Sequence, residues 1–461
     1  MLRDATTTFD AGSLRARLTG SFVLPSDPDW DHARQAWNLA VDQRPAAVAI
    51  PESVEDVIAV VRFARERGLR VAAQGTGHNA CAIETLEDTV LLKTSAMRGV
   101  EIDADGRRAR VQAGALWADV AVPASEAGLA ALAGSSHDVG VVGYSLGGGL
   151  SWLARKHGLA ANSILAVELV TPDGRLVRAD ADHEPDLFWA IRGGGGNFGV
   201  VTALELRLFP VERVYAGMVA FPWERATEVL QTWREWTDTV PDEVTSSGRI
   251  LQFPPLPDIP EPLRGRKLVV VEVAYLGDEA EGDRIIAPLR ALGPEMDTFA
   301  MITPAELLQL HMDPPAPVPG RGGHVMLGGL SAEAIDAFVA VAGPGSGSTL
   351  LSVELRQLGG AVGRPAESSG ALDGFDGRFA LFGVGIAMGP EAVAAIEATL
   401  ADVRRTLAMW TAGRPYLNFA EEPTDTRTAY PAETYERLQA IRAAHDPDEV
   451  MVANHPIPAS A

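Results

Sequence analysis

Glycine-rich stretches in the first half of this chain limit what it can fold into more than any other feature of the sequence. The first one follows an apolar run, Leu69–Ala73, that predicts a short buried strand. Gly75 and Gly77 let the backbone approach a ligand closely, because glycine has no Cβ atom. His78 stands at the tip of this loop. The pattern is typical of a site for a phosphate or a flat cofactor, and a plain turn with a solvated histidine is the alternative.

Two more glycine-rich stretches follow, at Ser135–Gly149 and Gly193–Gly199. Residues 133–149 hold six glycines among seventeen residues, which predicts irregular backbone rather than regular structure. The exposed N–H groups of such a segment suit a diphosphate. A floppy linker is the alternative, but the apolar residues interspersed through the segment favour wrapping around a ligand.

The third stretch, Gly194–Gly199, matches the G-x-G-x-x-G pattern of dinucleotide-binding loops. That fingerprint has to follow a strand and open a helix. Here a predicted helix, Asp186–Ile191, precedes the glycines, and an alternating run, Val200–Leu208, follows them as a strand. The order of elements excludes a nicotinamide-binding Rossmann unit.

Length, net charge and cysteine content limit the number of domains, the partners and the kinds of site that this chain can have. A length of 461 residues predicts two or three domains, and a net charge of −22 disfavours nucleic acid and anionic membranes as partners. Cys81 is the only cysteine, so no intramolecular disulfide and no multi-cysteine metal site can form. The N-terminus lacks a secretory signal pattern, and no apolar run reaches the ~20 residues of a membrane span. We therefore expect a cytoplasmic protein.

The pattern of predicted helices and strands changes after Pro210. The predicted strands beyond it are Lys267–Tyr275, Leu350–Gln357 and Arg378–Ala387. The predicted helices are Ala226–Trp236, Glu279–Leu292, Ser331–Ala342 and Pro390–Trp410. This mixture predicts an α+β domain with an antiparallel sheet. From Tyr416 onward the chain returns to loops, with one more helix at Ala432–Ala444.

Four elements in this order resemble the vanillyl-alcohol-oxidase-type FAD-linked oxidases, in particular their berberine-bridge-enzyme-like branch. They are Gln74–His78, Ser136–Gly149, Asp186–Val201, and Tyr416–Phe419 together with Asn454. The resemblance implies a two-domain α+β fold with FAD at the domain interface. A PCMH-type FAD-binding domain would comprise residues 1–210 and 411–461, and residues 211–410 would form an antiparallel-sheet substrate domain covered by helices.

The resemblance makes His78 the residue bonded to the flavin 8α-methyl group. Such a bond needs a neutral ring nitrogen, which a side chain with a pKa near ~6.5 provides at neutral pH. Gln74 and Thr76 stand where the family usually has arginine and glycine. Ser136 falls where doubly tethered members have a cysteine, and serine offers no thiolate, so we expect one covalent link at most. Cys81 is interpreted as a small buried residue.

The same resemblance assigns cofactor contacts along the chain. Tyr144 replaces a histidine that several members place beside the pyrimidine edge of the flavin, and Val139 takes the position that controls oxygen access. A small valine there favours an oxidase. The full set of predicted cofactor-binding residues is Gln74, Gly75, Thr76, Gly77, His78, Asn79, Ser136, His137, Val139, Gly140, Gly143, Tyr144, Gly147, Gly148, Asn197, Gly199, Val201, Asn418 and Asn454.

Tyr416 is the first candidate for the catalytic base, because its Tyr-x-Asn setting resembles the catalytic tyrosine of several members; a packed tyrosine beside the flavin is the alternative. Tyr144 is a further candidate for a catalytic role. Glu354 and Arg356 lie two apart on a predicted strand and so share a face, where they could serve as a base and an anchor for an anionic substrate, or form an ordinary ion pair.

Two histidines, His311 and His324, flank a proline-rich loop and could line the pocket, although lone histidines near loops are usually surface residues. No two histidines have ligand spacing on one helix, which disfavours a metal site. Ser145 lacks the G-x-S-x-G frame of a nucleophile elbow.

The function implied is an FAD-dependent oxidase. It would remove a hydride from a C–H bond next to oxygen or nitrogen of a small organic molecule, and O2 would reoxidise the flavin to give H2O2. Two alternatives stay open: an FAD-dependent dehydrogenase that uses another acceptor, and a flavin-binding protein without turnover. The sequence specifies neither the substrate nor the oligomeric state.

Overall fold

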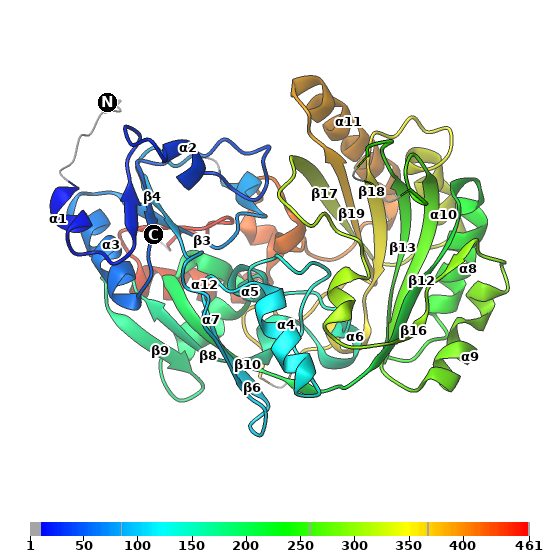
Figure 1. Cartoon of the computed structure of the whole chain (residues 1–461), viewed down its shortest axis with the longest axis horizontal. Helices are drawn as coiled ribbons and strands as arrows, with labels where there is room; N and C mark the ends of the chain where they lie inside the picture. The colour runs from blue at the N-terminus through cyan, green and yellow to red at the C-terminus, as the bar shows by residue number, and fades with distance from the viewer. Residues whose placement is uncertain (1–10, 84, 258, 260, 367, 460–461) are drawn as a thin grey trace.

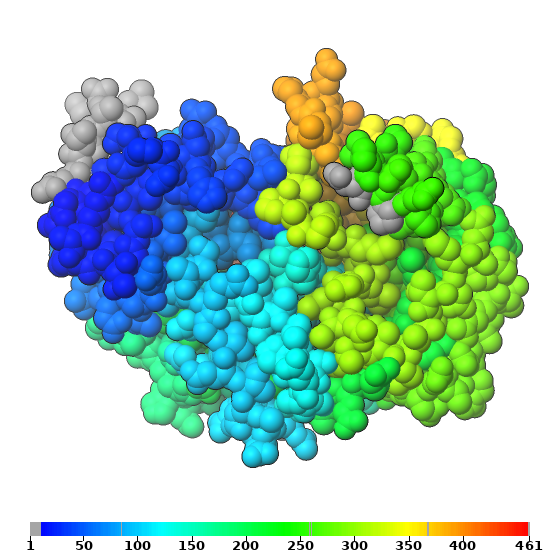
Figure 2. Space-filling model, in the orientation of Figure 1, coloured from blue at the N-terminus to red at the C-terminus, as the bar shows by residue number. Residues whose placement is uncertain are grey.

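A computed structural model describes residues 11–83, 85–257, 259, 261–366 and 368–459 of the chain. The N-terminal third lies on one side of the molecule, and the strands and helices between residues 214 and 407 lie on the other (Figure 1). Figure 2 shows the two sides in contact along the middle of the molecule. Residues 1–10 of the predicted first domain lie outside the described residues.

The first sheet has five strands and includes the C-terminal end of the chain. Its strands, in spatial order, are β1 (Ser21–Val23), β2 (Ala47–Ile50), β4 (Thr89–Lys93), β3 (Arg70–Gln74) and β20 (Met451–Val452). All neighbours except β1 and β2 are parallel. Helix α3 (Val54–Glu66) connects β2 to β3 and begins at Ser53, whose hydroxyl accepts a hydrogen bond from the Asp56 N–H as a capping side chain does. The predicted strand before His78 is therefore confirmed as β3.

The second sheet also has five strands, and all its neighbours are antiparallel. In spatial order they are β5 (Val100–Asp103), β6 (Arg108–Gln112), β10 (Val200–Arg207), β8 (Ile164–Val170) and β9 (Leu176–Asp180). The helices beside it are α4 (Trp117–Glu126), α5 (Val141–Leu146) and α7 (Pro185–Gly194). As predicted, a helix precedes the third glycine stretch and a strand follows it.

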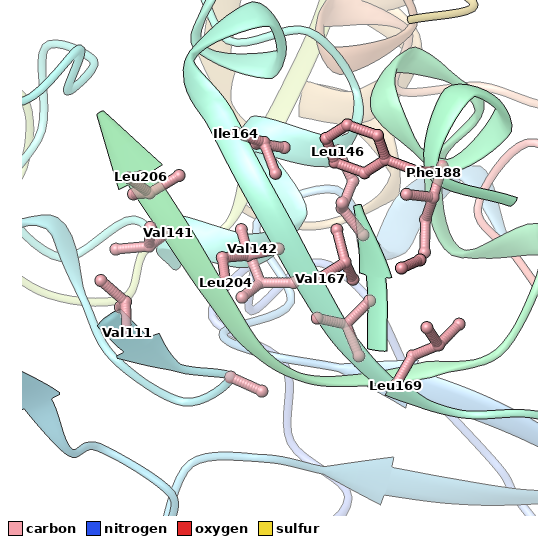
Figure 3. Close-up of a cluster of buried hydrophobic side chains, with 14 of the residues drawn as sticks. Val111, Val141, Val142, Leu146, Ile164, Val167, Leu169, Phe188, Leu204 and Leu206 are labelled. Carbon is pink, nitrogen blue, oxygen red and sulfur yellow. The ribbon is translucent and has the colours of Figure 1, made fainter. Parts of the chain in front are cut away.

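The expectation that residues 133–149 have no regular structure is wrong for their middle part. Val141–Leu146 form α5, with Gly140 as the N-cap residue. Val141, Val142 and Leu146 of this helix pack against Ile164 and Val167 of β8 and against β10, as Figure 3 shows. Burial of these apolar side chains outweighs the cost of about 1 kcal/mol that a glycine imposes inside a helix.

The third sheet is the largest, with eight antiparallel strands. Its strands are β12 (Val214–Pro222), β13 (Val244–Gln252), β14 (Lys267–Tyr275), β15 (Met296–Asp297), β16 (Ala300–Ile302), β17 (Gly320–Leu327), β18 (Ser352–Gln357) and β19 (Phe379–Ile386). The helices on its outer side are α8 (Ala226–Thr237), α9 (Glu279–Arg290), α10 (Ala332–Ala342) and α11 (Pro390–Leu407) (Figure 1). Apolar residues of β13, β14, β18 and β19 form a core with these helices. The predicted α+β class with an antiparallel sheet is confirmed.

The inner face of this sheet carries buried charged residues on β13, β14 and β18, and this part is called the polar face below. Strand residues point alternately to the two faces, and on β18 the alternation places Val353 and Leu355 in the core with the helices, leaving Glu354 and Arg356 on the opposite face. Arg249 of β13 is paired with Glu354 in the sheet register. The Arg356 guanidinium lies 5.3 Å from the ring centre of Phe419, so this face looks toward the C-terminal segment.

The last helix, α12 (Ala432–His445), confirms the prediction for residues 432–444. Among the described residues, no helix has both the length and the apolar character needed to cross a membrane.

Candidate functional site

His78 stands in a fixed orientation just beyond the end of β3. Its imidazole is stacked on the indole of Trp37, with ring centres 4.0 Å apart and an interplanar angle of 18°. Nδ1 lies 2.6 Å from the hydroxyl oxygen of Thr76, a hydrogen bond that holds one edge of the ring. Nε2 is buried without a hydrogen-bond partner among the described residues, and lies 3.7 Å from an oxygen of Asp138. This histidine is therefore not the solvated residue of a simple turn.

Asp138 carries a carboxylate in this cluster. One of its oxygens accepts a hydrogen bond of 2.6 Å from Trp37 Nε1, and the other accepts one of 2.8 Å from Ser136 Oγ. Burial alone would raise the pKa of the Asp138 carboxyl, but His78 and the two hydrogen bonds lower it to about 2. Neither Asp138 nor Trp37 was among the predicted site residues, because residues 101 positions apart give no local signal of their pairing.

Several buried polar atoms of residues 74–79 and 144–145 have no hydrogen-bond partner among the described residues. They are both amide atoms of Gln74, Oδ1 of Asn79, the hydroxyl oxygen of Tyr144 and Oγ of Ser145. Buried polar groups in proteins are nearly always paired, so a group of unpaired ones in one region indicates a bound ligand. A Cβ atom built on Gly143 would meet nothing within 4 Å, which leaves room beside α5.

The glycine-rich stretches lie next to one another. A Cβ on Gly140 would lie 3.7 Å from Cγ2 of Thr76, so the first and second stretches are neighbours. Glycine is required at Gly147, because a Cβ there would stand 1.8 Å from Oδ1 of Asn418. Gly148 has a φ of +120°, a conformation that side chains other than glycine rarely adopt.

Tyr416 is fully buried, and its hydroxyl oxygen receives two hydrogen bonds. The backbone N–H of Gly149 and Nδ2 of Asn418 each donate to it over 3.1 Å. Burial raises the pKa of Tyr416 to about 12, although both hydrogen bonds and the charge of Arg356 act to lower it. Burial also raises the pKa of Tyr144 well above the ordinary value, and the nearby Tyr416 adds to this effect. The Tyr144 and Tyr416 side chains therefore influence each other, and the charge of Arg356 acts on both.

Of the two interpretations of His311 and His324, the surface one is wrong, because both side chains are largely buried. Nε2 of His324 accepts a 3.2 Å hydrogen bond from the backbone N–H of Tyr416, and burial lowers the pKa of His324 to about 4. His324 belongs to β17, a strand that sequence analysis missed because glycine occupies three of its eight positions. His311 is buried at 4% exposure on the polar face of the large sheet.

A buried charged network crosses that face. His311 is held between two carboxylates, with Nδ1 2.7 Å from Glu272 and Nε2 2.9 Å from Glu354. Arg249 pairs with Glu272 at 2.6 Å, and Arg356 pairs with Glu354 at 2.8 Å. Burial and Arg249 act against protonation of His311, but the two carboxylates outweigh them and raise its pKa. Burial would raise the pKa of Glu354, yet Arg356 and His311 hold it well below the ordinary value. Both oxygens of Glu354 are thus already engaged.

The C-terminal residues and Asn197 mainly connect parts of the protein. The Asn197 amide donates to the carbonyl oxygens of Gly194 and His455 and accepts the N–H of Ile457. Asn454 donates to the carbonyl oxygen of Asn79. These side chains attach the C-terminal tail to the glycine-rich loops.

The remaining predicted residues lie in the same region of the fold. Val139 is partly buried against the core of the second sheet, while Val201 is buried within it. The His137 carbonyl oxygen accepts the N–H of Ala118. Gly199 has to be glycine, because a Cβ there would lie 2.6 Å from the carbonyl oxygen of Val170. In the part of the chain that is described, no group of three or more histidine, cysteine, aspartate or glutamate residues has the arrangement of a metal site.

Comparisons with known proteins agree with this geometry. The family FAD_binding_4, described as an FAD binding domain, matches residues 45–180. The chain is 30% identical to (R)-6-hydroxynicotine oxidase of Paenarthrobacter nicotinovorans over 461 aligned positions, covering 95% of this chain and 97% of that protein. The structure of BBE-like 1 from Physcomitrella patens superposes with a TM-score of 0.82 at 21% identity, covering 97% of this chain and 99% of the other.

The grass pollen allergen Phl p 4 has the same fold. Its TM-score is 0.80 at 19% identity, covering 95% of this chain and 97% of the other. The wild-type protein is named a glucose dehydrogenase, and an isoleucine-to-valine variant is named a glucose oxidase. The unpaired polar atoms, the space beside Gly143 and the converging glycine-rich loops fit an FAD molecule, and the matched relatives are FAD enzymes. The chain is therefore an FAD-dependent oxidoreductase of the FAD-linked oxidase family, and it shares the fold of berberine-bridge-enzyme-like proteins.

Proposed function

We propose that this enzyme is an oxidase that removes a hydride from a C–H bond next to oxygen or nitrogen of a small organic molecule. FAD, when bound, accepts the hydride, and O2 is the final acceptor, giving H2O2. The relative named (R)-6-hydroxynicotine oxidase supports an oxidase reaction. The division into an FAD-binding part, residues 1–210 with 411–461, and a substrate part, residues 211–410, belongs to the same proposal. The pairing of β20 with β3 supports it.

The hydroxyl of Tyr416 is the observation that carries this proposal. An oxygen that accepts two N–H hydrogen bonds holds negative charge more easily, so Tyr416 is suited to take the substrate proton as the hydride departs. Because its pKa is about 12, Tyr416 is protonated in most molecules at neutral pH, so the minor phenolate form is the base that takes this proton. Tyr144, whose hydroxyl has no partner within the described residues, is placed to donate a hydrogen bond to the flavin or the substrate.

Glu354 and Arg356 receive different roles. Glu354 has both oxygens engaged and a lowered pKa, so we assign it to positioning Arg356 rather than to proton abstraction. Arg356 lines a small pocket between the two halves together with Ser135, Leu150, Ser151, Trp152, Thr245, Ser246 and Gln357. Trp152 Nε1 is buried there without a partner among the described residues. Arg356 would anchor an oxygen atom or an anionic group of the substrate in this pocket.

We further propose that one covalent bond joins His78 to the flavin, and that the other predicted contact residues line the FAD site. The fixed imidazole with an unpartnered Nε2 supports the bond. Val139 supports oxygen as the acceptor, because the family resemblance gives it the position that controls oxygen access; in Phl p 4, the wild type is named a glucose dehydrogenase and an isoleucine-to-valine variant a glucose oxidase. A branched side chain one methylene smaller leaves more room for O2.

Two measurements test the function. A substrate panel is first screened under anaerobic conditions for bleaching of the flavin absorbance; an oxidoreductase bleaches with at least one member. Reoxidation in air is then followed together with H2O2 release. Rapid reoxidation with stoichiometric peroxide is expected. Slow reoxidation in air combined with fast reoxidation by a dye would indicate a dehydrogenase, and a flavin that no substrate bleaches would indicate binding without turnover.

A further inference from the structure

We propose that Asp138 is the positioning residue for attachment of the flavin: its carboxylate stabilises the positive charge that His78 acquires while the bond to the flavin forms. This inference rests on the covalent bond proposed above. It adds a residue outside the predicted FAD contacts and gives it a distinct task.

The chemistry of attachment creates the need for such a group. A C–H bond of the 8α-methyl group and the N–H bond of the imidazole are replaced by one C–N bond. The two protons and two electrons released are taken up by dioxygen, which becomes hydrogen peroxide. When a neutral imidazole attacks, its ring carries a full positive charge until the N–H proton leaves. A carboxylate within about 4 Å favours this charged form.

The contacts of His78 leave one ring nitrogen for the reaction. Thr76 binds Nδ1, and stacking on Trp37 prevents the ring from tilting. Nε2 is buried without a partner in the described part of the chain, with Asp138 3.7 Å away. That distance is too long for a hydrogen bond that would occupy the Nε2 lone pair, and short enough for a strong interaction between charges.

Asp138 is held ready for this role. Trp37 and Ser136 fix its two oxygens by hydrogen bonds of 2.6 and 2.8 Å. In the described residues its ion-pair partner is His78, and no lysine or arginine is paired with it. Its charge is therefore not cancelled by a permanent cation and acts on the imidazole. Trp37 contributes twice, because the same indole stacks on His78 and donates to Asp138.

The test measures attachment itself rather than turnover. Wild-type and Asp138→Asn proteins are purified from cells harvested at successive times after induction. Total flavin is read from the visible spectrum, and covalent flavin from the colour that stays with the polypeptide after acid precipitation. Asp138→Asn is expected to bind total FAD as the wild type does, while covalent flavin accumulates at least about tenfold more slowly. Asp138→Glu, which keeps the charge, is expected to recover much of the rate.

A matched control comes from the chain itself. Asp180 pairs with His183 at 2.8 Å on the surface, so Asp180→Asn removes an aspartate from a histidine pair remote from the flavin and should leave attachment unchanged. If Asp138→Asn does not fold, Trp37→Phe replaces it, since phenylalanine keeps the stacking and loses the N–H bond to Asp138; slower attachment is again expected.

The outcomes separate this inference from the proposed function. Attachment at the wild-type rate in Asp138→Asn, or in Trp37→Phe where that variant is used, overturns the role of Asp138 and leaves the oxidase proposal intact. A wild-type protein that is yellow but releases all its flavin in acid overturns the covalent bond, and the inference with it, while substrate-dependent bleaching still tests the oxidase.

Discussion

At the scale of single residues, the site combines groups whose pKa values their surroundings move far apart, through burial for the phenols and through hydrogen bonds and charge for the carboxyl. Tyr416 and Tyr144 are phenols with raised pKa values, whereas Asp138 is a carboxyl with a lowered one. The phenols stay protonated at neutral pH, and the carboxylate stays charged. The proton-transfer groups are thus gathered near Arg356, and a negative charge is placed beside His78.

Replacing Tyr416 by phenylalanine removes the proposed base while leaving the ring in place. We expect the rate of anaerobic flavin reduction to fall by about 10²–10⁴-fold, which is the usual contribution of a general base. In the wild type, the same rate should rise with pH above neutrality, because the pKa of about 12 keeps the phenolate scarce at pH 7. Stopped-flow absorbance measures both. Tyr275→Phe, at the partly exposed end of β14, is the control, and an unchanged rate in Tyr416→Phe would assign proton removal to another group.

Replacing Val139 by isoleucine tests oxygen access at one side chain. Reoxidation by O2 should slow severalfold, whereas anaerobic reduction and reoxidation by a dye should stay as in the wild type. The ratio of oxygen-dependent to dye-dependent turnover measures the effect. Val177→Ile is a matched control, because both valines are partly buried against the same core. Equal ratios in the two variants would show that the Val139 side chain does not control access of oxygen to the flavin.

At the scale of elements, sequence patterns predicted those strands and helices whose buried apolar residues recur at a regular spacing or in an unbroken run. The strand Lys267–Tyr275 has an apolar run and was located to the residue. Strand β13 was missed because Ser246 and Ser247 look like loop residues, yet both are buried between neighbouring strands. Trp233 donates to Ser246, which donates to Gln357. Such polar burial depends on partners far away in the sequence.

Strand β17 and the segment after Tyr416 are joined by His324, and this pairing should depend on pH. The pKa of His324 is about 4 when folded and ~6.5 when unfolded, because burial disfavours the charged ring. The unfolded chain therefore binds the proton first, and stability is lost as pH falls from 6.5 toward 4. At pH 5 this one group should cost about 2 kcal/mol.

Urea unfolding at pH 7 and pH 5 measures the effect. His324→Gln keeps an acceptor for the Tyr416 N–H and cannot titrate, so its loss of stability between the two pH values should be smaller than that of the wild type. His183→Gln changes an exposed histidine and should show the full wild-type loss. An identical pH dependence in all three proteins would contradict the burial of a neutral His324.

At the scale of the whole molecule, the site was predicted from four motifs, whose order along the chain resembles that of the family. Their resemblance to a family located the glycine-rich loops, His78 and Tyr416. It could not show contacts between residues that lie far apart in the chain, such as Asn454 with Asn79, 375 positions apart, or Arg249 with His311 on the polar sheet face. These contacts are set by how sheets and loops pack, which leaves no periodic trace in the chain.

Arg155 is one such contact, and it holds the two halves together. From α6 (Ala154–His157) its buried guanidinium donates to three carbonyl oxygens of the other half, those of Val244, Leu358 and Pro241. Burial lowers the pKa of Arg155, so part of its interaction energy is spent on desolvation. Removing the side chain leaves these buried acceptors unpaired, and each unpaired buried group is costly.

We expect Arg155→Ala to lower the free energy of unfolding by about 3 kcal/mol. Arg155→Lys should lose less, since an ammonium keeps the charge but cannot reproduce the planar fork of donors. Arg364 pairs with Asp242 nearby and is 63% exposed, so Arg364→Ala should change stability by less than about 1 kcal/mol. Urea unfolding followed by tryptophan fluorescence measures all three. Arg155 takes no part in the proposed chemistry. Flavin reduction in those Arg155 variants that fold should therefore keep the wild-type pH profile. A shifted profile would mean that the contact between the two halves also sets the geometry around Tyr416.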